Sequence, residues 1–380
     1  MVMTWNVIYV LAFVMSMALT SYIIPKIIVI SYKKKLFDVV DSRKVHVGSV
    51  PRLGGVAFTP TIIITFCLMA GVHVVSGPIE GVSLLSYAPL VALYLCSLVI
   101  LYLEGIADDL VGVGYKPKFA VMFFVSMLVV WSGTYLHDFQ GIFFLHRILP
   151  LVGALLSMVL IVFVINAINM IDGVDGLASG VSMLAFFFFF VFFAYRRDVF
   201  FASLALVSLG MLIPFWVFNV FGKVERQRKI FMGDTGAQTV GLLLSLLAMR
   251  LAMARPDTEG WFSCPLMVAM TLLLVPCFDV VRVFCWRIRH RRNPFLPDKQ
   301  HIHHKLMAVG MSGRTTMMII IAVEAFYILL NLSMLTVADV NIVLLTDVVS
   351  YAVLHIVLSY IIRRKESMTA GQSAVGSNNV

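Results

Sequence analysis

Charged residues are scarce in this sequence. Only 13% of its 380 residues are Asp, Glu, Lys or Arg, whereas a soluble domain typically carries about a quarter. Conversely, 61% are hydrophobic and the mean hydropathy is +0.97. No loop between the apolar runs is long enough to fold as a separate domain. These absences exclude a soluble globular enzyme and predict an all-α polytopic membrane protein.

Cysteine is also rare. The five cysteines fall in or beside apolar runs without any paired spacing, so the sequence indicates neither a disulfide framework nor a zinc ribbon. The net charge of +9 comes mostly from basic loops between apolar runs. It is therefore a signal of membrane topology, and we expect the lipid bilayer as a partner and no nucleic acid.

Eleven apolar runs are long enough to cross a bilayer, which takes roughly twenty helical residues. The predicted spans lie near 4–30, 55–76, 87–103, 118–136, 148–168, 179–195, 200–220, 236–254, 262–285, 315–336 and 343–362. If the N-terminus lies outside, 22 of the 29 Lys and Arg residues fall in inner loops and five in outer segments. We therefore predict an outer N-terminus and a cytosolic C-terminus. One membrane domain is expected over 1–365, followed by a disordered tail over 366–380.

One polar stretch lies between the fifth and sixth predicted spans. It places four polar side chains at the mouth of these helices: Asn166, Asn169, Asp172 and Asp175. On an unbroken helix, steps of three residues would spread them over half the circumference, beyond the reach of one small ligand. Gly173 and Gly176 allow a turn in which the two carboxylates converge. A polar loop that only caps the two helices is the alternative.

The first inner loop carries charges whose role stays open. It contains Asp41, Lys44, His46 and Arg52 among Gly and Pro residues. Its cations either flank the first span as solvated residues or meet phosphate in a shaped loop.

An adjacent pair of aspartates, Asp108 and Asp109, follows the third predicted span. Like charges repel, so such a pair is either well solvated or neutralised by a cation. A DDxxD prenyl-diphosphate site would need Asp at position 112, where this chain has Gly112. Lys116 and Lys118 are either basic flank or phosphate contacts.

Asp234 lies between glycines at the start of an apolar helix, which is typical of a capped helix N-terminus and also of a site for an anion or a metal-bound phosphate. Asp279 and Arg282 lie three residues apart inside a predicted span, where we expect a structural ion pair.

Three histidines, His301, His303 and His304, follow Asp298 in the largest inner loop. They could bind zinc, but no HExxH or CxxC motif and no fourth soft ligand accompany them. Beside many cations, they are better interpreted as contacts to phosphate or pyrophosphate.

These polar stretches all fall on one predicted side of the membrane. Several carboxylates there suit Mg²⁺ bound together with substrate phosphates. The sequence thus favours phosphoryl transfer between a cytosolic donor and a membrane-embedded acceptor. A transporter or a lipid scaffold is the alternative, and a transporter would place its polar groups near the midplane.

Four motifs in order resemble the polyprenyl-phosphate N-acetylhexosamine-1-phosphate transferase family, and within it the bacterial undecaprenyl-phosphate GlcNAc-1-phosphate transferases. The motifs are the Asp108-Asp109 pair, Asn169-Met-Ile-Asp-Gly-Val-Asp-Gly, Met232-Gly-Asp-Thr-Gly and Pro297-Asp-Lys-Gln-His-Ile-His-His. The resemblance covers about Asp41 to Gly310. Ile302 interrupts the three consecutive histidines of the related phospho-MurNAc-pentapeptide transferases, which argues against a peptidoglycan precursor as substrate.

The resemblance implies transfer of GlcNAc-1-phosphate from UDP-GlcNAc to undecaprenyl phosphate, giving undecaprenyl-diphospho-GlcNAc and UMP. It implies Mg²⁺ or Mn²⁺ as cofactor and a cytosolic-face active site in the bacterial inner membrane, where the reaction would begin a surface polysaccharide such as the O-antigen. The same reaction with another UDP-N-acetylhexosamine or with UDP-MurNAc-pentapeptide stays open, as does a homodimer.

The resemblance also implies roles for individual residues. Catalytic roles would belong to Asp108, Asp109, Asp172, His301, His303 and His304. Metal binding would belong to Asp234, with Asp172 and Asp109. Substrate contacts would come from Asp41, Lys44, His46, Arg52, Lys118, Asn166, Asn169, Asp175 and Asp298.

Overall fold

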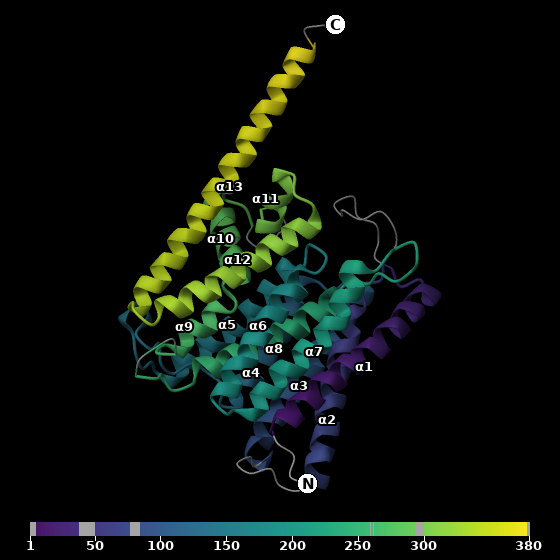
Figure 1. The fold of residues 1–380 in the computed structure, drawn as a ribbon, viewed down its shortest axis with the longest axis vertical. Coiled ribbons are helices and arrows are strands. Elements are labelled where there is room, and N and C mark those ends of the chain that lie inside the picture. Colours follow the sequence, from purple (N-terminus) through teal and green to yellow (C-terminus); the bar gives the residue numbers. More distant parts are fainter. Residues whose placement is uncertain are drawn as a thin grey trace.

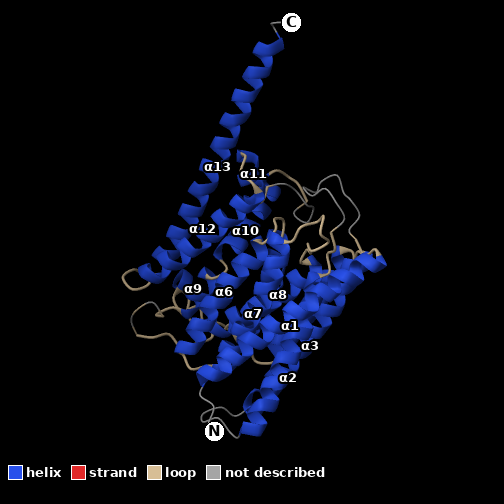
Figure 2. Cartoon of the chain, turned by 45° about the vertical axis from the view of Figure 1, so that its right-hand side comes forward, coloured by secondary structure: helices blue, strands red, loops and turns tan. Residues whose placement is uncertain are grey.

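The computed structural model describes residues 5–37, 50–76, 84–258, 260, 262–293 and 300–377. These residues form thirteen α-helices and two short 3₁₀ turns, and within them there is no β-strand (Figures 1 and 2). The predicted all-α fold class is confirmed.

The helices follow one another with short connections. In chain order they are α1 Trp5–Lys34, α2 Phe58–Ser76, α3 Leu84–Val111, α4 Tyr115–Trp131, α5 Pro150–Ile171, α6 Leu177–Tyr195, α7 Val199–Phe221, α8 Gly233–Ala252, α9 Pro265–Thr271, α10 Leu274–Arg289, α11 Ile302–Val309, α12 Gly313–Met334 and α13 Val340–Ser377. The 3₁₀ turns are η1 Gly54–Ala57 and η2 Ile142–Phe144.

The predicted number of spans is not confirmed. Nine helices in the described ranges are long and apolar enough to cross a membrane. The expected span 262–285 is a broken pair instead, because α9 and α10 meet at an angle of 75°. The helix expected over 118–136 is α4, which has only 17 residues. It ends just before Gly133, whose φ of 88° no continuing helix adopts.

Two helices are longer than the sequence predicts. α3 was expected to end at residue 103, but it continues to Val111, so Asp108 and Asp109 lie on its last turns and not in a loop. It runs on because it packs against α8, where a Cβ at Gly105 would meet the Thr235 backbone at 2.5 Å. α13 is helical to Ser377, across most of the segment expected to be a disordered tail.

α8 lies in the middle of the bundle and is buried along almost its whole length (Figure 1). It packs against α3, α5, α6 and α9. At the contact with α5, a Cβ at Gly241 would lie 2.7 Å from the Cα atom of Ile165, so only glycine permits this approach. The first turn of α8 is thereby held at the centre of one end of the bundle.

The two ends of the bundle differ. α1 begins at the lower end in Figure 1, whereas α13 runs to the upper end and extends beyond the other helices. α11 lies at the upper end. The first turn of α8 lies on the same side, because Asn169 near the end of α5 binds Asp234, and His303 of α11 covers Gly173 just after α5. The orientation of this end toward the cytosol stays a prediction.

Candidate active site

The start of α8 is fixed by the segment before η1. The backbone N–H of Phe231 donates to the Pro51 carbonyl at 2.8 Å, and the N–H of Gly55 donates to the Met232 carbonyl at 2.8 Å. Gly233 has a φ of 72°, and a Cβ there would meet the Arg52 carbonyl oxygen at 1.9 Å. A side chain at Gly233 would therefore push these two segments apart.

Four helices contribute to a polar cluster around Asp234. The ammonium group of Lys118 on α4 lies 2.6 Å from Asp108 on α3 and 3.1 Å from Asp234 on α8. The side-chain amide of Asn169 on α5 donates to the same Asp234 oxygen at 2.6 Å. One cation thus bridges two carboxylates, and three of the residues that the sequence singled out separately surround Asp234.

Asp109 is used differently from its neighbour. Its carboxylate accepts hydrogen bonds from the backbone N–H groups of Asp234 and Thr235 at 2.8 and 3.0 Å, and from the Thr235 hydroxyl at 2.6 Å. These donors belong to the first turn of α8, whose N–H groups have no partner within the helix. Asp109 therefore caps α8 from another helix, and both its oxygens are engaged.

The predicted glycine turn follows directly on α5. The helix ends at Ile171, and Gly176 adopts a φ of 77°. Loss of hydration in its packed surroundings and then the charge of Asp234 raise the pKa of Asp172 to about 7. Asp175 forms an ion pair with Lys229, and its negative charge also contributes to the raised pKa of Asp172.

The histidine segment lies against this turn. A Cβ at Gly173 would sit 2.4 Å from Nε2 of His303, so the ring covers the glycine. His301 and His303 are buried, with parallel rings whose centroids are 5.8 Å apart. Burial and the neighbouring His304 and His301 lower the pKa of His303 to about 3. The structure therefore places His303 in contact with the segment that carries Asp172.

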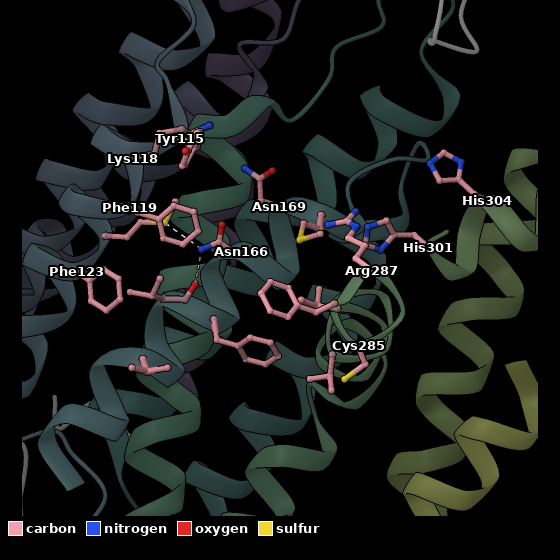
Figure 3. Close-up of a pocket in the computed structure, with 18 residues that line it drawn as sticks. Tyr115, Lys118, Phe119, Phe123, Asn166, Asn169, Cys285, Arg287, His301 and His304 are labelled. Carbon is pink, nitrogen blue, oxygen red and sulfur yellow. Dashed lines mark hydrogen bonds between the residues drawn. The ribbon is translucent and has the colours of Figure 1, made fainter. Parts of the chain in front are cut away.

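A cavity of about 670 Å³ opens beside this cluster, between α4, α5 and α10 (Figure 3). Most of its wall is apolar and includes Phe119, Met122, Phe123, Val162, Phe163 and Phe284. Its polar lining includes Lys118, Asn169, Arg287, His301 and His304. In Figure 3, Lys118 and Asn169 lie in the upper part of the view, and Phe123 and Cys285 lie below them. The cavity therefore combines an apolar slot with cationic and amide groups.

The remaining predicted site residues line the cavity, act on Asp172 by their charge, or lie outside the described residues. Asn166 also lines the cavity, but its amide donates to the Val162 carbonyl of its own helix at 2.8 Å. The Arg52 charge acts on Asp172. Four predicted substrate contacts lie outside the described residues: Asp41, Lys44, His46 and Asp298.

The sequence left several residues of this region without a role. Lys229 is buried and paired with Asp175. Asn219 accepts from the Gly176 N–H at 2.6 Å and donates to the Ile230 carbonyl at 2.8 Å, so it fixes the glycine turn. The motif spacing carries no signal for these two residues. Asp279 was expected to form only an ion pair, but it also contacts His301.

Comparisons with known proteins agree with this geometry. Residues 90–252 match the family model described as glycosyl transferase family 4. A probable undecaprenyl-phosphate N-acetylglucosaminyl 1-phosphate transferase of Bacillus subtilis is 30% identical over 312 residues, covering 82% of this chain and 80% of that protein. The undecaprenyl-phosphate alpha-N-acetylglucosaminyl 1-phosphate transferase of Escherichia coli K12 is 25% identical over 298 residues, or 77% of this chain and 74% of the other.

A shorter match, to a decaprenyl-phosphate N-acetylglucosaminephosphotransferase of Mycobacterium leprae, is 31% identical over 134 residues, or 32% of either chain. The long match to the Bacillus protein, together with the four ordered motifs, decides the family. The chain belongs to the polyprenyl-phosphate N-acetylhexosamine-1-phosphate transferases of glycosyl transferase family 4.

Proposed function

We propose that this protein transfers GlcNAc-1-phosphate from UDP-GlcNAc to undecaprenyl phosphate. The observation that carries the proposal is the cavity of Figure 3, where an apolar slot meets Lys118 and Asn169, both bound to Asp234. A long isoprenoid chain with a phosphate head has the same division into an apolar and an anionic part. The names of the Bacillus and Escherichia relatives support this acceptor and this sugar.

Charge neutralisation is the main chemical task, because both substrates are anions. A phosphate monoester has its second pKa near 6, so the lipid phosphate is largely a dianion at neutral pH and needs no base. Its oxygen attacks the sugar-linked phosphorus of the donor. The bond from that phosphorus to the oxygen it shares with the uridine-linked phosphate breaks, and UMP leaves.

The protein's own groups would lower the repulsion between the two anions. Lys118 is already held against Asp108 and Asp234, at the polar part of the cavity. Arg287 and His301 line the same cavity. Fixed cations such as Lys118 and Arg287 stabilise charge in the transition state, because they need no reorganisation when the reaction occurs.

The donor set fits Mg²⁺, with Mn²⁺ as a substitute. Within the described residues, no three acidic, histidine or cysteine side chains are close enough to hold a metal alone. This agrees with Mg²⁺, which keeps waters and shares substrate phosphates beside one or two carboxylates. Asp234 and Asp172 would hold it, because Asp109 has both oxygens on α8. Bound there, Mg²⁺ would neutralise the donor diphosphate.

The finer details follow from the same proposal. We place the active site on the cytosolic face of the inner membrane, because UDP-sugars are cytosolic and the basic loops lie at this end. The product would begin a surface polysaccharide. Another UDP-N-acetylhexosamine would use the same groups, so the sugar must be measured.

The test is UMP release by the purified protein in detergent. Undecaprenyl phosphate and Mg²⁺ are supplied with UDP-GlcNAc, UDP-GalNAc or UDP-MurNAc-pentapeptide in turn. Asp234→Asn is compared with Asp257→Asn, the same change beyond the opposite end of α8, where Asp257 pairs with Arg196. We expect lipid- and metal-dependent UMP from UDP-GlcNAc, lost at least about 100-fold in Asp234→Asn alone.

Two results would reject the proposal. If folded wild-type protein releases no UMP from any donor, the transferase proposal fails, and a transporter or a lipid scaffold becomes the leading alternative. If Asp257→Asn loses as much activity as Asp234→Asn, the cluster around Asp234 is not the site. UMP release from a different UDP-sugar would support the proposed reaction but would identify a sugar other than GlcNAc.

A further inference from the structure

Asp279 on α10 and His301, just before α11, form a buried pair beside the cavity. Oδ2 of Asp279 lies 2.8 Å from Nδ1 of His301, and their side chains are 2% and 7% exposed. We propose that Asp279 is a positioning residue: it holds His301 as the tautomer protonated on Nδ1 and turns Nε2 toward the phosphate-binding part of the cavity. The identity of that ligand rests on the proposed function, whereas the tautomer does not.

The contacts of Asp279 determine which ring nitrogen carries the proton. Its Oδ1 accepts from the guanidinium of Arg282 at 2.8 Å, and both oxygens lie within 3.2 Å of the Ile302 backbone N–H. A carboxylate beside a guanidinium is ionised and only accepts hydrogen bonds. Nδ1 of His301 must therefore be the donor, which leaves Nε2 to accept a proton or to contact a ligand.

The Asp279 carboxylate also fixes the position of the His301 ring. Ile302 is the first residue of α11, and its N–H has no partner within that helix. By accepting from both Ile302 and His301, Asp279 ties the beginning of α11 to α10. Arg282 strengthens the tie, because it donates to the Gln300 carbonyl as well. The backbone and the ring of His301 are thus held by one buried group.

The Nε2 edge of the His301 ring faces the cavity in our proposal. His301 lines it together with Arg287 and His304 (Figure 3). Nε2 of His301 makes no hydrogen bond within the described part of the chain. When this nitrogen takes a proton, the imidazolium is backed by Asp279 and donates from Nε2 to an anionic oxygen. A phosphate group is the ligand class that such a donor recognises.

The neighbouring histidine provides the contrast. His303 is as deeply buried, but its Nδ1 has no partner in the described ranges. Its ring covers Gly173, and no carboxylate among the described residues accepts a hydrogen bond from its Nδ1. Of these two buried histidines, only His301 is built to carry a proton at its ligand-facing edge. The motif therefore contains histidines with different tasks, and Asp279 selects one of them.

The first test reads the tautomer directly. The protein is labelled with ¹⁵N-histidine in detergent without substrate, and the signals of His301 are identified by their loss in His301→Gln. We expect Nδ1 of His301 to be protonated in the wild type, and this preference to be lost in Asp279→Asn. A His301 ring protonated on Nε2 and bare on Nδ1 would overturn the proposal.

The second test separates positioning from folding. Asp279→Asn keeps an oxygen for Arg282, and we expect it to fold and to lose UMP release about 10- to 100-fold, the usual scale for an outer-shell partner. Asp347→Asn is the matched control, because Asp347 is also buried but accepts from Asn331 at 2.8 Å, whereas His301 and Arg282 both bind Asp279. An Asp279→Asn protein with full activity would reject the role.

Two substitutions of His301 distinguish its nitrogens. The Asn amide reaches the position of Nδ1 and keeps the bond to Asp279, whereas the Gln amide reaches the position of Nε2. We expect His301→Gln to retain more activity than His301→Asn, and the reverse order would show that the ring only anchors α11. If the wild type itself releases no UMP, the proposed function fails, and the ¹⁵N result still decides the tautomer.

Discussion

Asp109 caps the helix that carries Asp234. Its carboxylate accepts from the Asp234 backbone N–H at 2.8 Å and from the Thr235 hydroxyl at 2.6 Å, whereas its neighbour Asp108 faces Lys118 at 2.6 Å. The two adjacent aspartates point to different partners, because successive helical residues are separated by about 100°. Asp109 therefore fixes the start of α8, whereas Asp108 forms an ion pair with Lys118.

This division predicts different effects of replacing Asp109 and Asp234. Asp109→Asn should lower the stability of the protein by about 1 kcal/mol, the usual cost of a weakened helix cap, and should leave the Mg²⁺ concentration for half-maximal activity unchanged. Asp234→Asn should raise that Mg²⁺ concentration with little loss of stability. Thermal unfolding in detergent and Mg²⁺ titrations of UMP release measure both. A raised Mg²⁺ requirement in Asp109→Asn would show that Asp109 is a metal ligand.

Lys118 should matter far more than Lys116. Lys118 bridges Asp108 and Asp234, whereas Lys116 is exposed on the same turn of α4. Removing the bridging charge leaves two carboxylates facing each other and weakens the attraction for phosphate. We expect Lys118→Met to lower the specificity constant for undecaprenyl phosphate about 10-fold or more, which corresponds to roughly 1.4 kcal/mol.

Initial rates at varied lipid concentration test this expectation, and Lys116→Met is the matched control. Equal effects of the two substitutions would mean that only the general positive charge of this face attracts the lipid. An unchanged lipid dependence in Lys118→Met would remove Lys118 from the acceptor site.

Lys116 and Lys118 also show which features of the site could be predicted from the sequence and which could not. Spacing and charge could place both lysines near the membrane surface, but only the packing of α4 against α3 and α5 decides which one meets the carboxylates. Similarly, four separated motifs could be predicted to share one side of the bundle. Their actual contacts, such as the ring of His303 on Gly173, depend on side-chain packing between segments that are 130 residues apart.

The apolar pattern of the sequence does not predict the break between α9 and α10. The run 262–285 is apolar enough for one straight span, and its bend of 75° leaves backbone N–H groups without helical partners. Glu324 on α12 supplies one of them, because its Oε2 accepts from the Val275 N–H at 2.8 Å. The acidic residue Glu324, which lies within the predicted span 315–336, thus stabilises the break between α9 and α10 in a neighbouring span.

Glu324 should therefore be replaceable by Gln but not by Leu. Its side chain is 0% exposed, so Glu324→Leu would leave a buried N–H unsatisfied at a cost of about 1–3 kcal/mol. Gln keeps an acceptor oxygen of the same reach and should retain most of the stability. Thermal unfolding of both variants in detergent checks this. If Gln destabilises as strongly as Leu, the ionised carboxylate itself and not the backbone bond is required.

His303 predicts how the stability of the site region depends on pH. Burial first, and then His304 and His301, lower its pKa from the ordinary value of 6.5 to about 3. Between these two values the unfolded chain binds the extra proton and the folded chain does not, so the free energy of unfolding falls as the pH falls. This group alone contributes a slope of up to about 1.4 kcal/mol per pH unit.

His303→Gln should flatten that slope, because Gln has no proton to gain on unfolding. The midpoint of thermal unfolding is measured in detergent from pH 7 to pH 4.5 for the wild type, His303→Gln and His137→Gln, the last changing an exposed histidine. We expect the wild type and His137→Gln to lose stability in parallel, and His303→Gln to lose less over the same range. Three parallel curves would mean that the His303 ring takes up its proton in the folded protein near pH 6.5, which its packing against Gly173 should prevent.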